Sequence, residues 1–239
     1  MSFIKNPLIV ALDVDTVDEA VSLAGALAPS TGAFKVGMQL FNSAGPEAVR
    51  RLIEKNAPVF VDLKLHDIPN TVAGAARALT RHGAAIFNVH AAGGRVMMQE
   101  AARAARDEAA KAGIKPPLVI AVTVLTSIDE GMFNQELGIP GTIEERVVAW
   151  ARLAKEAGMD GVVASPKEIA AIRGACGNNF VIITPGVRPA GAAANDQKRT
   201  MTPGEAVKLG ADYLVVGRPV TAAPDPVAAA KAILQEIGV

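Results

Sequence analysis

The chain contains, at residues 61–71, the stretch Val61-Asp-Leu-Lys-Leu-His-Asp-Ile-Pro-Asn-Thr71. Its first half alternates apolar and charged residues, which predicts a strand that turns into a helix at Ile68-Pro69. In an extended chain, side chains two residues apart share a face, so Asp62 and Lys64 are expected to point the same way. Asp67 lies just past the expected strand end. The stretch therefore predicts two carboxylates around one ammonium group at the carboxyl end of a strand.

These charged residues have two interpretations: a half-buried ion pair on an edge strand, or part of a functional site. The preceding run Pro58-Val-Phe-Val61 is too apolar for an edge strand, so the charges would lie in an interior that charges normally avoid. One lysine also cannot neutralise two nearby carboxylates, which leaves a repulsion that stability alone does not require. We therefore favour the functional interpretation, with Val61, Leu63 and Leu65 facing away from the site.

Apolar runs alternate with alanine-rich segments of helical period along the whole chain. Strands are expected at residues 8–13, 34–40, 59–64, 85–90, 118–125, 161–164, 180–184 and 213–217. Helices are expected at residues 17–27, 46–55, 72–81, 96–112, 143–157, 166–173, 203–209 and 226–237. First-turn prolines and glycine stops mark several helix ends, namely Pro46, Pro166, Pro203, Pro226, Gly83, Gly113, Gly158 and Gly210.

Eight strand–helix units in 239 residues take about 30 residues each, which is the spacing of a βαβ unit. Strands that are apolar on both faces indicate a parallel sheet covered by helices. Eight such units without an internal linker fit a closed barrel better than an open sheet. We predict the α/β class and a (β/α)8 TIM barrel, with residues 1–239 as a single domain. The irregular segment 126–141 is expected to be a loop with a short helix.

Composition narrows the classes of function. The 24 basic and 24 acidic residues give a formal charge of zero, and no basic cluster or aromatic-interleaved patch predicts nucleic-acid binding. The lone Cys176 excludes an internal disulfide. Residues 1–6 lack the features of a signal peptide, and no apolar run approaches the length of a membrane span. We expect a soluble protein of the cytoplasm that binds neither nucleic acid nor a membrane.

In such a barrel the site forms at the carboxyl ends of the strands and in the loops that follow. Polar and conformationally special residues concentrate at these positions, namely Asp13, Lys35, Asp62, Lys64, Asp67, His90, Thr126, Ser127, Pro185, Gly186, Arg188, Gly217 and Arg218. This concentration predicts an active site at that end of the barrel.

The last two of these loops resemble a phosphate site. Thr184-Pro-Gly-Val-Arg188 and Val216-Gly-Arg218 each place glycine and arginine just past a strand. Glycine lets backbone N–H groups approach an anion, and arginine supplies a bidentate fork. The alternative is two ordinary turns with surface arginines. Gln197 lies in the long seventh loop, which is expected either to fold over a ligand or to be only a mobile polar segment.

A lysine inside a barrel has three interpretations: a Schiff base, a general acid, or a balancing charge. Lys64 is flanked by Asp62 and Asp67, which should keep it charged, so we favour a proton donor. The setting of Lys35 between Phe34 and Val36 favours burial over pairing with a surface glutamate. No residues have metal-ligand spacing, and there is no dinucleotide fingerprint.

The residues quoted so far closely resemble the orotidine 5′-phosphate decarboxylase family. The signature Asp62-x-Lys64-x-x-Asp67-Ile-Pro-x-Thr71 matches that family's motif. The match covers the whole chain through Ala11-Leu-Asp13, Lys35-Val-Gly-Met38, Asn88-Val-His-Ala-Ala-Gly-Gly94, residues 123–127, Thr184-Pro-Gly186, Asn195-Asp-Gln197 and Val215-Val-Gly-Arg218. A bare Asp-x-Lys-x-x-Asp is less specific, because related sugar-phosphate decarboxylases and synthases share it.

The resemblance implies cofactor-free and metal-free decarboxylation of orotidine 5′-monophosphate to uridine 5′-monophosphate, the last step of de novo pyrimidine biosynthesis. It implies that Lys64 protonates C6 as carbon dioxide leaves, with Asp62 against the departing carboxylate. Asp67 would enter from the partner subunit of a homodimer. The implied catalytic set is Asp62, Lys64, Asp67 and Lys35.

The resemblance also implies the substrate contacts. Asp13 and Lys35 would hold the ribose hydroxyls, and Thr126 would contact the pyrimidine edge. The implied phosphate ligands are Arg188, Gln197, Gly217 and Arg218. The other implied substrate-binding residues are Leu63, Leu65, His66, Ile68, Pro69, Asn70, Thr71 and Pro185, of which Ile68 and Thr71 would line the neighbouring subunit's site with Asp67. His66, taken from its strand position alone, is interpreted as structural.

Two alternatives remain from the sequence. One is a barrel that binds a nucleotide or sugar phosphate without turnover, which would not need an acidic and a basic group side by side. The other is a magnesium-dependent sugar-phosphate decarboxylase on the same scaffold, which His66-Asp-Ile-Pro69 and Asn195-Asp-Gln197 disfavour.

Overall fold

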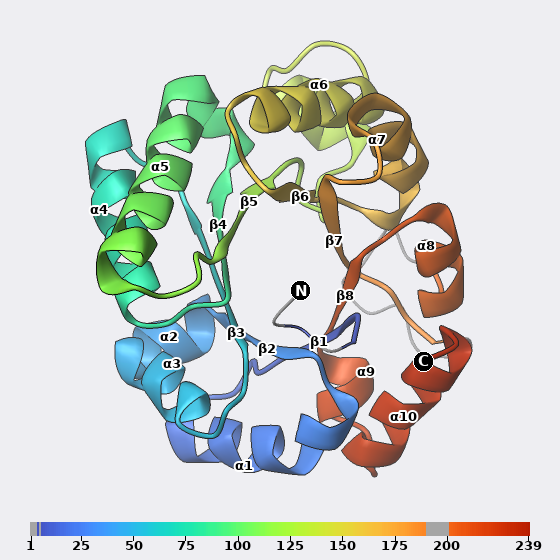
Figure 1. The fold of residues 1–239 in the computed structure, drawn as a ribbon. Helices are drawn as coiled ribbons and strands as arrows, with labels where there is room; N and C mark the ends of the chain where they lie inside the picture. Colours follow the sequence, from blue (N-terminus) through green and yellow to red (C-terminus); the bar gives the residue numbers. More distant parts are fainter. Residues whose placement is uncertain (1–3, 5, 190–200) are drawn as a thin grey trace.

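The computed structural model describes residue 4, residues 6–189 and residues 201–239. Eight parallel strands form a closed barrel in chain order, which confirms the predicted (β/α)8 fold (Figure 1). The strands are β1 (Leu8–Ala11), β2 (Ala33–Gly37), β3 (Val59–Leu65), β4 (Ile86–His90), β5 (Leu118–Val122), β6 (Gly161–Val163), β7 (Val181–Pro185) and β8 (Tyr213–Val216). The pairing of β1 with β8 closes the ring.

Helices surround the ring on its outside (Figure 1). The α-helices are α1 (Val17–Leu27), α2 (Met38–Ala44), α3 (Pro46–Ile53), α4 (Pro69–Arg81), α5 (Gly94–Ala112), α6 (Ile143–Glu156), α7 (Ile169–Cys176), α8 (Pro203–Leu209), α9 (Arg218–Thr221) and α10 (Pro226–Glu236). Short 3-10 turns lie at η1 (Ala28–Ser30), η2 (Ala91–Gly93) and η4 (Pro166–Glu168), and a π turn lies at η3 (Met132–Glu136). The π turn is the short helix expected within 126–141.

Local sequence explains where the helices begin and end. The predicted first-turn prolines all occupy the first turn of a helix or 3-10 turn. The predicted glycine stops all have positive φ, as a residue that ends a helix often does. Thr142 caps α6 in a capping box with Glu145.

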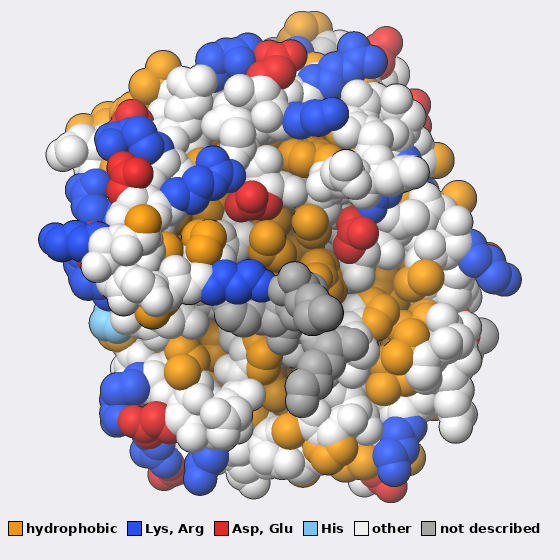
Figure 2. Space-filling view, viewed as in Figure 1, with side chains coloured by type: hydrophobic (Ala, Val, Ile, Leu, Met, Phe, Trp, Pro, Cys, Tyr) orange, Lys and Arg blue, Asp and Glu red, His pale blue; other side chains and the backbone are white. Residues whose placement is uncertain are grey.

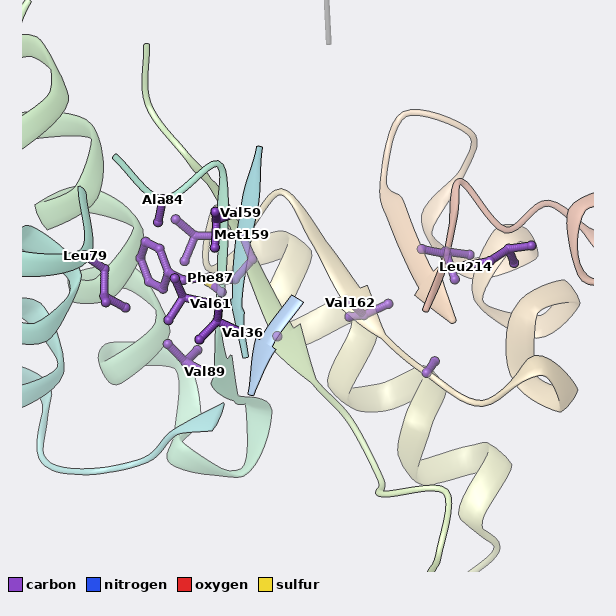
Figure 3. Packing of buried hydrophobic residues seen from close by; sticks show 14 of the residues in the cluster. Val36, Val59, Val61, Leu79, Ala84, Phe87, Val89, Met159, Val162 and Leu214 are labelled. Carbon is purple, nitrogen blue, oxygen red and sulfur yellow. The ribbon is translucent and has the colours of Figure 1, made fainter. Parts of the chain in front are cut away.

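The barrel wall separates two apolar cores, because successive side chains on a strand point to opposite sides. The inner cluster lies within the ring and includes Ile9, Ala33, Phe60, Ile86, Ile120 and Ile183. The outer cluster lies between strands and helices, and Figure 3 shows Leu79 of α4 close to Val61 of β3 and Phe87 of β4. Leu63 and Leu65 pack against this outer cluster, which confirms that they face away from Asp62.

Polar residues occupy the next inward positions toward the carboxyl ends of three strands. Lys35 on β2, Asp62 on β3 and Asn88 on β4 each lie two residues past a member of the inner cluster. The inner core therefore supports a polar layer from below, and that layer is where the site begins.

Several predicted boundaries were wrong by one to three residues, and three of them lie just past the carboxyl ends of β2, β3 and β5. Residues 38–40 were expected to continue a strand but begin α2, because a short apolar run cannot be assigned to helix or strand from periodicity alone. Residues 123–125 lie beyond β5 rather than within it. Helix α4 begins at Pro69 instead of residue 72, since proline suits the first helical turn and holds Ile68 in an extended conformation before it.

Figure 2 shows one face of the molecule in the orientation of Figure 1. Basic and acidic side chains are interspersed around the described part of this face, with hydrophobic side chains exposed among them. None of the helices within the described residues combines the length and apolar character needed to cross a membrane.

Candidate active site

A chain of four charged groups lies at the carboxyl ends of β1, β2 and β3. The Nζ of Lys64 lies 2.8 Å from Oδ1 of Asp62, and the Nζ of Lys35 lies 3.5 Å from Oδ2 of the same carboxylate. Lys35 also donates to Oδ1 of Asp13 at 3.0 Å. The Asp62 side chain is only 13% exposed, whereas that of Asp13 is 53% exposed. The network of charged groups therefore extends from the solvent-exposed carboxylate of Asp13 to the buried carboxylate of Asp62.

Asp62 is held in its ionised form. Burial alone would raise the pKa of this carboxyl, but the charges of Lys35 and Lys64 and the hydrogen bonds from Lys64 and Asn88 outweigh it. The pKa of Asp62 consequently lies below its ordinary value. Two ammonium groups and one carboxylate give the buried part of the site a net positive charge, which suits an anionic ligand.

The conformation of β3 at Lys64 is irregular. Lys64 has a φ of 51°, in the left-handed region, where a non-glycine residue costs about 1–2 kcal/mol. Val61 pairs with Phe87 and Leu65 with Val89, so four residues of β3 span the distance of two on β4. The prediction that Asp62 and Lys64 point the same way is confirmed, since both line one cavity, but regular strand alternation is not the reason.

Asp67 does not join this network within the chain. No ion pair among the described residues links it to Lys64, and its Oδ1 accepts from the backbone N–H of Ile68 at 2.6 Å. The expected pair of carboxylates around one ammonium is thus replaced, within one chain, by two ammonium groups around Asp62. Asp67 is exposed and Ile68 is 66% exposed, because both lie past the strand end on the outer rim.

A cavity of about 300 Å³ opens beside Lys64 and Asp62. Its other lining residues are Phe60, Val122, Val124, Leu125, Thr126, Ser127, Val163, Ala164, Pro185 and Val215. One wall is therefore charged and most of the remainder is apolar, as in most pockets that bind a small molecule.

A second cavity, of about 210 Å³, lies beside the first, since Pro185 and Val215 line both. It is lined by Ala11, Asp13, Lys35, Gly186, Val187, Arg188, Gly217, Arg218 and Pro219 as well. Lys35 of β2 lies in this cavity with Arg188, Arg218 and two glycines that follow β7 and β8. Three cationic side chains and two glycines make the cavity suitable for a phosphate. A ligand with a ring at one end and a phosphate at the other would span both cavities.

Arg188 is placed to bind an anion. Its side chain is buried, and its Nε has no hydrogen-bond partner among the residues that the structure describes. Burial, and then the charge of Arg218, lower the pKa of Arg188 below its ordinary range. A bound phosphate would supply the missing acceptor and the opposing charge. The Arg188 backbone N–H donates to the carbonyl of Met201 at 2.9 Å, which fixes the residue relative to the start of α8.

The remaining predicted residues that the structure describes lie at two other places. Leu63, Leu65, His66 and Thr71 line a third cavity, of about 290 Å³, on the outer side of β3 together with Asp67 and Lys64. Pro69 and Asn70 form the first turn of α4. Gln197 lies outside the described residues, and its role stays a prediction.

His66 forms a ring pair with His90, with their centroids 5.5 Å apart. Burial, and then the charges of His66 and Lys64, lower the pKa of His90. The role of His66 stays a prediction.

Sequence reasoning missed two residues that shape the site. Asn88 hydrogen-bonds to both Asp62 and Lys64. A Cβ on Gly37 would lie 2.8 Å from the Lys35 Nζ and 3.1 Å from Oδ1 of Asp13, so glycine leaves room for these side chains in their present positions. The sequence feature that could have identified them is their position, since Asn88 is a polar residue and Gly37 a glycine at inward-facing strand positions. Within the described residues, no group of histidine, cysteine, aspartate and glutamate side chains is placed to hold a metal ion.

The fold is that of a (β/α)8-barrel enzyme, and its candidate site at the carboxyl ends of the strands has a charged wall and an arginine-lined cavity. Residues 6–233 match the profile of the Orotidine 5′-phosphate decarboxylase / HUMPS family. A protein of Moorella thermoacetica named orotidine 5′-phosphate decarboxylase is 60% identical over 233 residues, with 98% of this chain and 92% of the relative covered. The protein of that name from Heliobacterium modesticaldum is 54% identical, with coverages of 98% and 96%.

Solved structures agree with these sequence relatives. The crystal structure of orotidine 5′-phosphate decarboxylase from Lactobacillus acidophilus superposes with a TM-score of 0.87 at 38% identity, covering 98% of this chain and all of that one. The chain belongs to the orotidine 5′-phosphate decarboxylase / HUMPS family.

Proposed function

We propose that this chain is a carboxy-lyase that converts orotidine 5′-monophosphate into uridine 5′-monophosphate and carbon dioxide, the last step of de novo pyrimidine biosynthesis. The observation that carries the proposal is the Lys35–Asp62–Lys64 network on the wall of a ring-sized cavity that adjoins an arginine-lined cavity. The names of the relatives support the same reaction. Residues 1–239 would act as one catalytic domain, in the cytoplasm and without a cofactor or metal.

Lys64 would carry the chemical step. When the bond from C6 to the carboxyl carbon breaks, its electron pair remains on C6, where no conventional electron sink exists. The ammonium group of Lys64 would stabilise that charge and then transfer a proton from Nζ to C6, leaving a neutral amine that regains its proton from solvent. Its partner Asp62, which stays ionised, would keep Lys64 charged before the reaction. The same carboxylate would face the substrate carboxylate and disfavour the bound ground state.

The other end of the substrate would supply binding energy. Arg188, Gly217 and Arg218 would hold the phosphate, which the cavity they line supports. Asp13 and Lys35 would hold the ribose hydroxyls, and Thr126 would contact the pyrimidine edge from the ring-sized cavity. Gln197 would close over the phosphate. Contacts remote from C6 can in this way organise the charged groups around the reacting bond.

A homodimer would complete the site. We propose that Asp67, with Ile68 and Thr71, reaches the cavity of a partner subunit and contributes the second carboxylate beside Lys64. The exposure of Asp67 and Ile68 on the rim, and the absence of an Asp67–Lys64 ion pair among the described residues, support this arrangement. Mixing Lys64→Ala protein with Asp67→Ala protein tests it: hybrid dimers should regain activity, and no regained activity from subunits that demonstrably exchange would contradict a shared site.

The reaction itself is tested by adding orotidine 5′-monophosphate to purified protein with a chelator present and following uridine 5′-monophosphate. Wild-type protein should form product, Lys64→Ala should form none, and Lys111→Ala, which removes an exposed lysine at the end of α5, should behave as wild type. Wild-type protein that binds uridine 5′-monophosphate without turnover would identify a binding protein instead. Turnover of a sugar phosphate that the chelator abolishes would identify the magnesium-dependent alternative.

A further inference from the structure

Asn88 of β4 lies buried between the two central groups of the site. Its side chain is 1% exposed, its Nδ2 donates to Oδ1 of Asp62 at 2.7 Å, and its Oδ1 accepts from the backbone N–H of Lys64 at 2.8 Å. We propose that Asn88 is a positioning residue, whose carboxamide fixes the carboxylate of Asp62 and the backbone of Lys64 and thereby aims the lysine ammonium group. This inference rests on the proposed function of Lys64 as the proton donor.

The backbone of β3 shows why such a residue is required. Between Val61 and Leu65 the strand departs from the regular ladder with β4, and Lys64 adopts a positive φ. A regular strand would pair the N–H of Lys64 with a backbone carbonyl of a neighbour, but here the side chain of Asn88 accepts that hydrogen bond. The side chain therefore replaces a missing ladder contact at the one residue of β3 in the left-handed region.

The carboxamide is suited to both contacts at once. A backbone N–H can only donate and an ionised carboxylate can only accept, so the oxygen of Asn88 must face Lys64 and its nitrogen must face Asp62. Oδ1 of Asp62 accepts from Asn88 and from the Nζ of Lys64 at 2.8 Å, which joins the three residues through one oxygen atom. Leucine has a similar size but can form neither contact, and an ionised aspartate can form only the contact to Lys64.

Asn88 acts through these neighbours rather than on the ligand. It lines neither of the two cavities, and its register partner on β5 is the apolar Ile120. The charged groups nearest to its carboxamide are Asp62 and Lys64 on β3, with Lys35 on β2 on the far side of Asp62. Removing the carboxamide should consequently lower the rate of the chemical step while the affinity for the phosphate end is kept.

The first test compares Asn88→Leu with wild type and with Thr80→Val, which removes a buried hydroxyl hydrogen bond at the far end of α4. For Asn88→Leu we expect kcat to fall about 10- to 100-fold, since hydrogen bonds to a charged group are lost. Affinity for uridine 5′-monophosphate should stay within about twofold of wild type. Thr80→Val should lower thermal stability without changing kcat. A kcat for folded Asn88→Leu protein within about threefold of wild type would overturn the proposal.

The second test measures the pH dependence of Asn88→Asp. This substitution keeps the shape of the side chain, so it can be used even if Asn88→Leu folds poorly. Burial beside Asp62 should raise the pKa of the introduced carboxyl group. When protonated, that group can again donate to Asp62 and accept from Lys64. The activity of Asn88→Asp relative to wild type should thus rise as the pH is lowered, whereas the relative activity of Asn88→Leu should stay flat. A flat ratio for Asn88→Asp would contradict positioning through the donated hydrogen bond.

A crystal structure of Asn88→Leu gives a readout that does not depend on turnover. We expect Lys64 to leave the left-handed region or its Nζ to move away from Asp62. An unchanged φ at Lys64 together with an unchanged Nζ–Asp62 contact would refute the positioning role. Failure of wild-type protein to convert orotidine 5′-monophosphate would instead refute the proposed function, and the crystallographic comparison would still decide the role of Asn88.

Discussion

Replacing Gly37 with alanine would place a methyl group against the ammonium group of Lys35. The backbone at Gly37, with φ of −88° and ψ of −177°, is accessible to any residue, so the substitution causes no backbone strain. Its effect comes from the new Cβ, which would lie 2.8 Å from the Lys35 Nζ. Ordinary contacts begin at 3.4 Å, so the two atoms must separate by about 0.6 Å (3.4 minus 2.8).

The flexible end of Lys35 can move that far, which is why we expect a functional rather than a structural defect. The movement would lengthen the contacts of Lys35 with Asp13 and Asp62, now 3.0 Å and 3.5 Å. Misplacement of a charged group by a fraction of an ångström to one ångström costs about 10- to 100-fold in rate, and we expect kcat/KM to fall in this range. Stability should change by less than about 1 kcal/mol, because alanine also restricts the unfolded chain.

The assay is steady-state decarboxylation of orotidine 5′-monophosphate, paired with thermal unfolding. Gly25→Ala in α1 is the matched control, since a Cβ there would meet nothing within 4 Å. It should raise stability slightly, by about 0.5–1 kcal/mol, and leave kcat/KM unchanged. A kcat/KM for Gly37→Ala within about threefold of wild type, in a protein that remains stable, would refute the claim that the position of Lys35 depends on this glycine.

Three further predictions concern stability and reactivity. The pKa of Asp62 is lowered in the folded protein from its ordinary 3.8, so ionised Asp62 stabilises the fold above about pH 4. This contribution is lost as the pH falls through the folded pKa. Asp62→Asn should therefore weaken the pH dependence of the unfolding free energy in that acidic range, as measured by urea titration at several pH values. Burial raises the pKa of the Cys176 thiol, so a disulfide exchange reagent should label it slowly in native protein and rapidly in urea, and equal rates would contradict the burial. Arg173 pairs with Asp212 and donates to backbone carbonyls, so Arg173→Ala should destabilise the protein by about 2–4 kcal/mol. The control Arg95→Ala breaks an exposed ion pair and should cost less than about 1 kcal/mol. Chemical denaturation measures both free energies of unfolding.

The periodicity of the sequence was enough to predict the barrel. The pattern of apolar runs located all eight strands, and prolines and glycines located most helix ends, because both signals act within a few residues. The errors fell where local signals are ambiguous. Residues 38–40 are as apolar as a strand, yet they form the first turn of α2 because β2 ends where its ladder with β3 ends, at Gly37 and Asp62.

The site was predictable as a set of strand-end residues but not as an arrangement. Lys35 and Asp13 are 22 residues apart, and their contact follows from the pairing of β1 with β2. The two cavities share Pro185 and Val215 because β7 pairs with β8, and β8 pairs with β1 when the ring closes, which no local pattern encodes. The residues of the neighbouring subunit's site, led by Asp67, stay a prediction.

The sequence by itself determined the alternation of strands and helices, the aliphatic cores and the strand-end positions of the polar and charged residues. Only the tertiary structure decided the orientation of the Lys64 side chain. Its left-handed conformation is locally unfavourable, so no sequence pattern predicts it. That conformation is stabilised by Asn88, 24 residues away along the chain, whose carboxamide reaches Lys64 and Asp62 only because β3 and β4 pair with an irregular register. A geometry that depends on contacts between strands exists only once the barrel has formed.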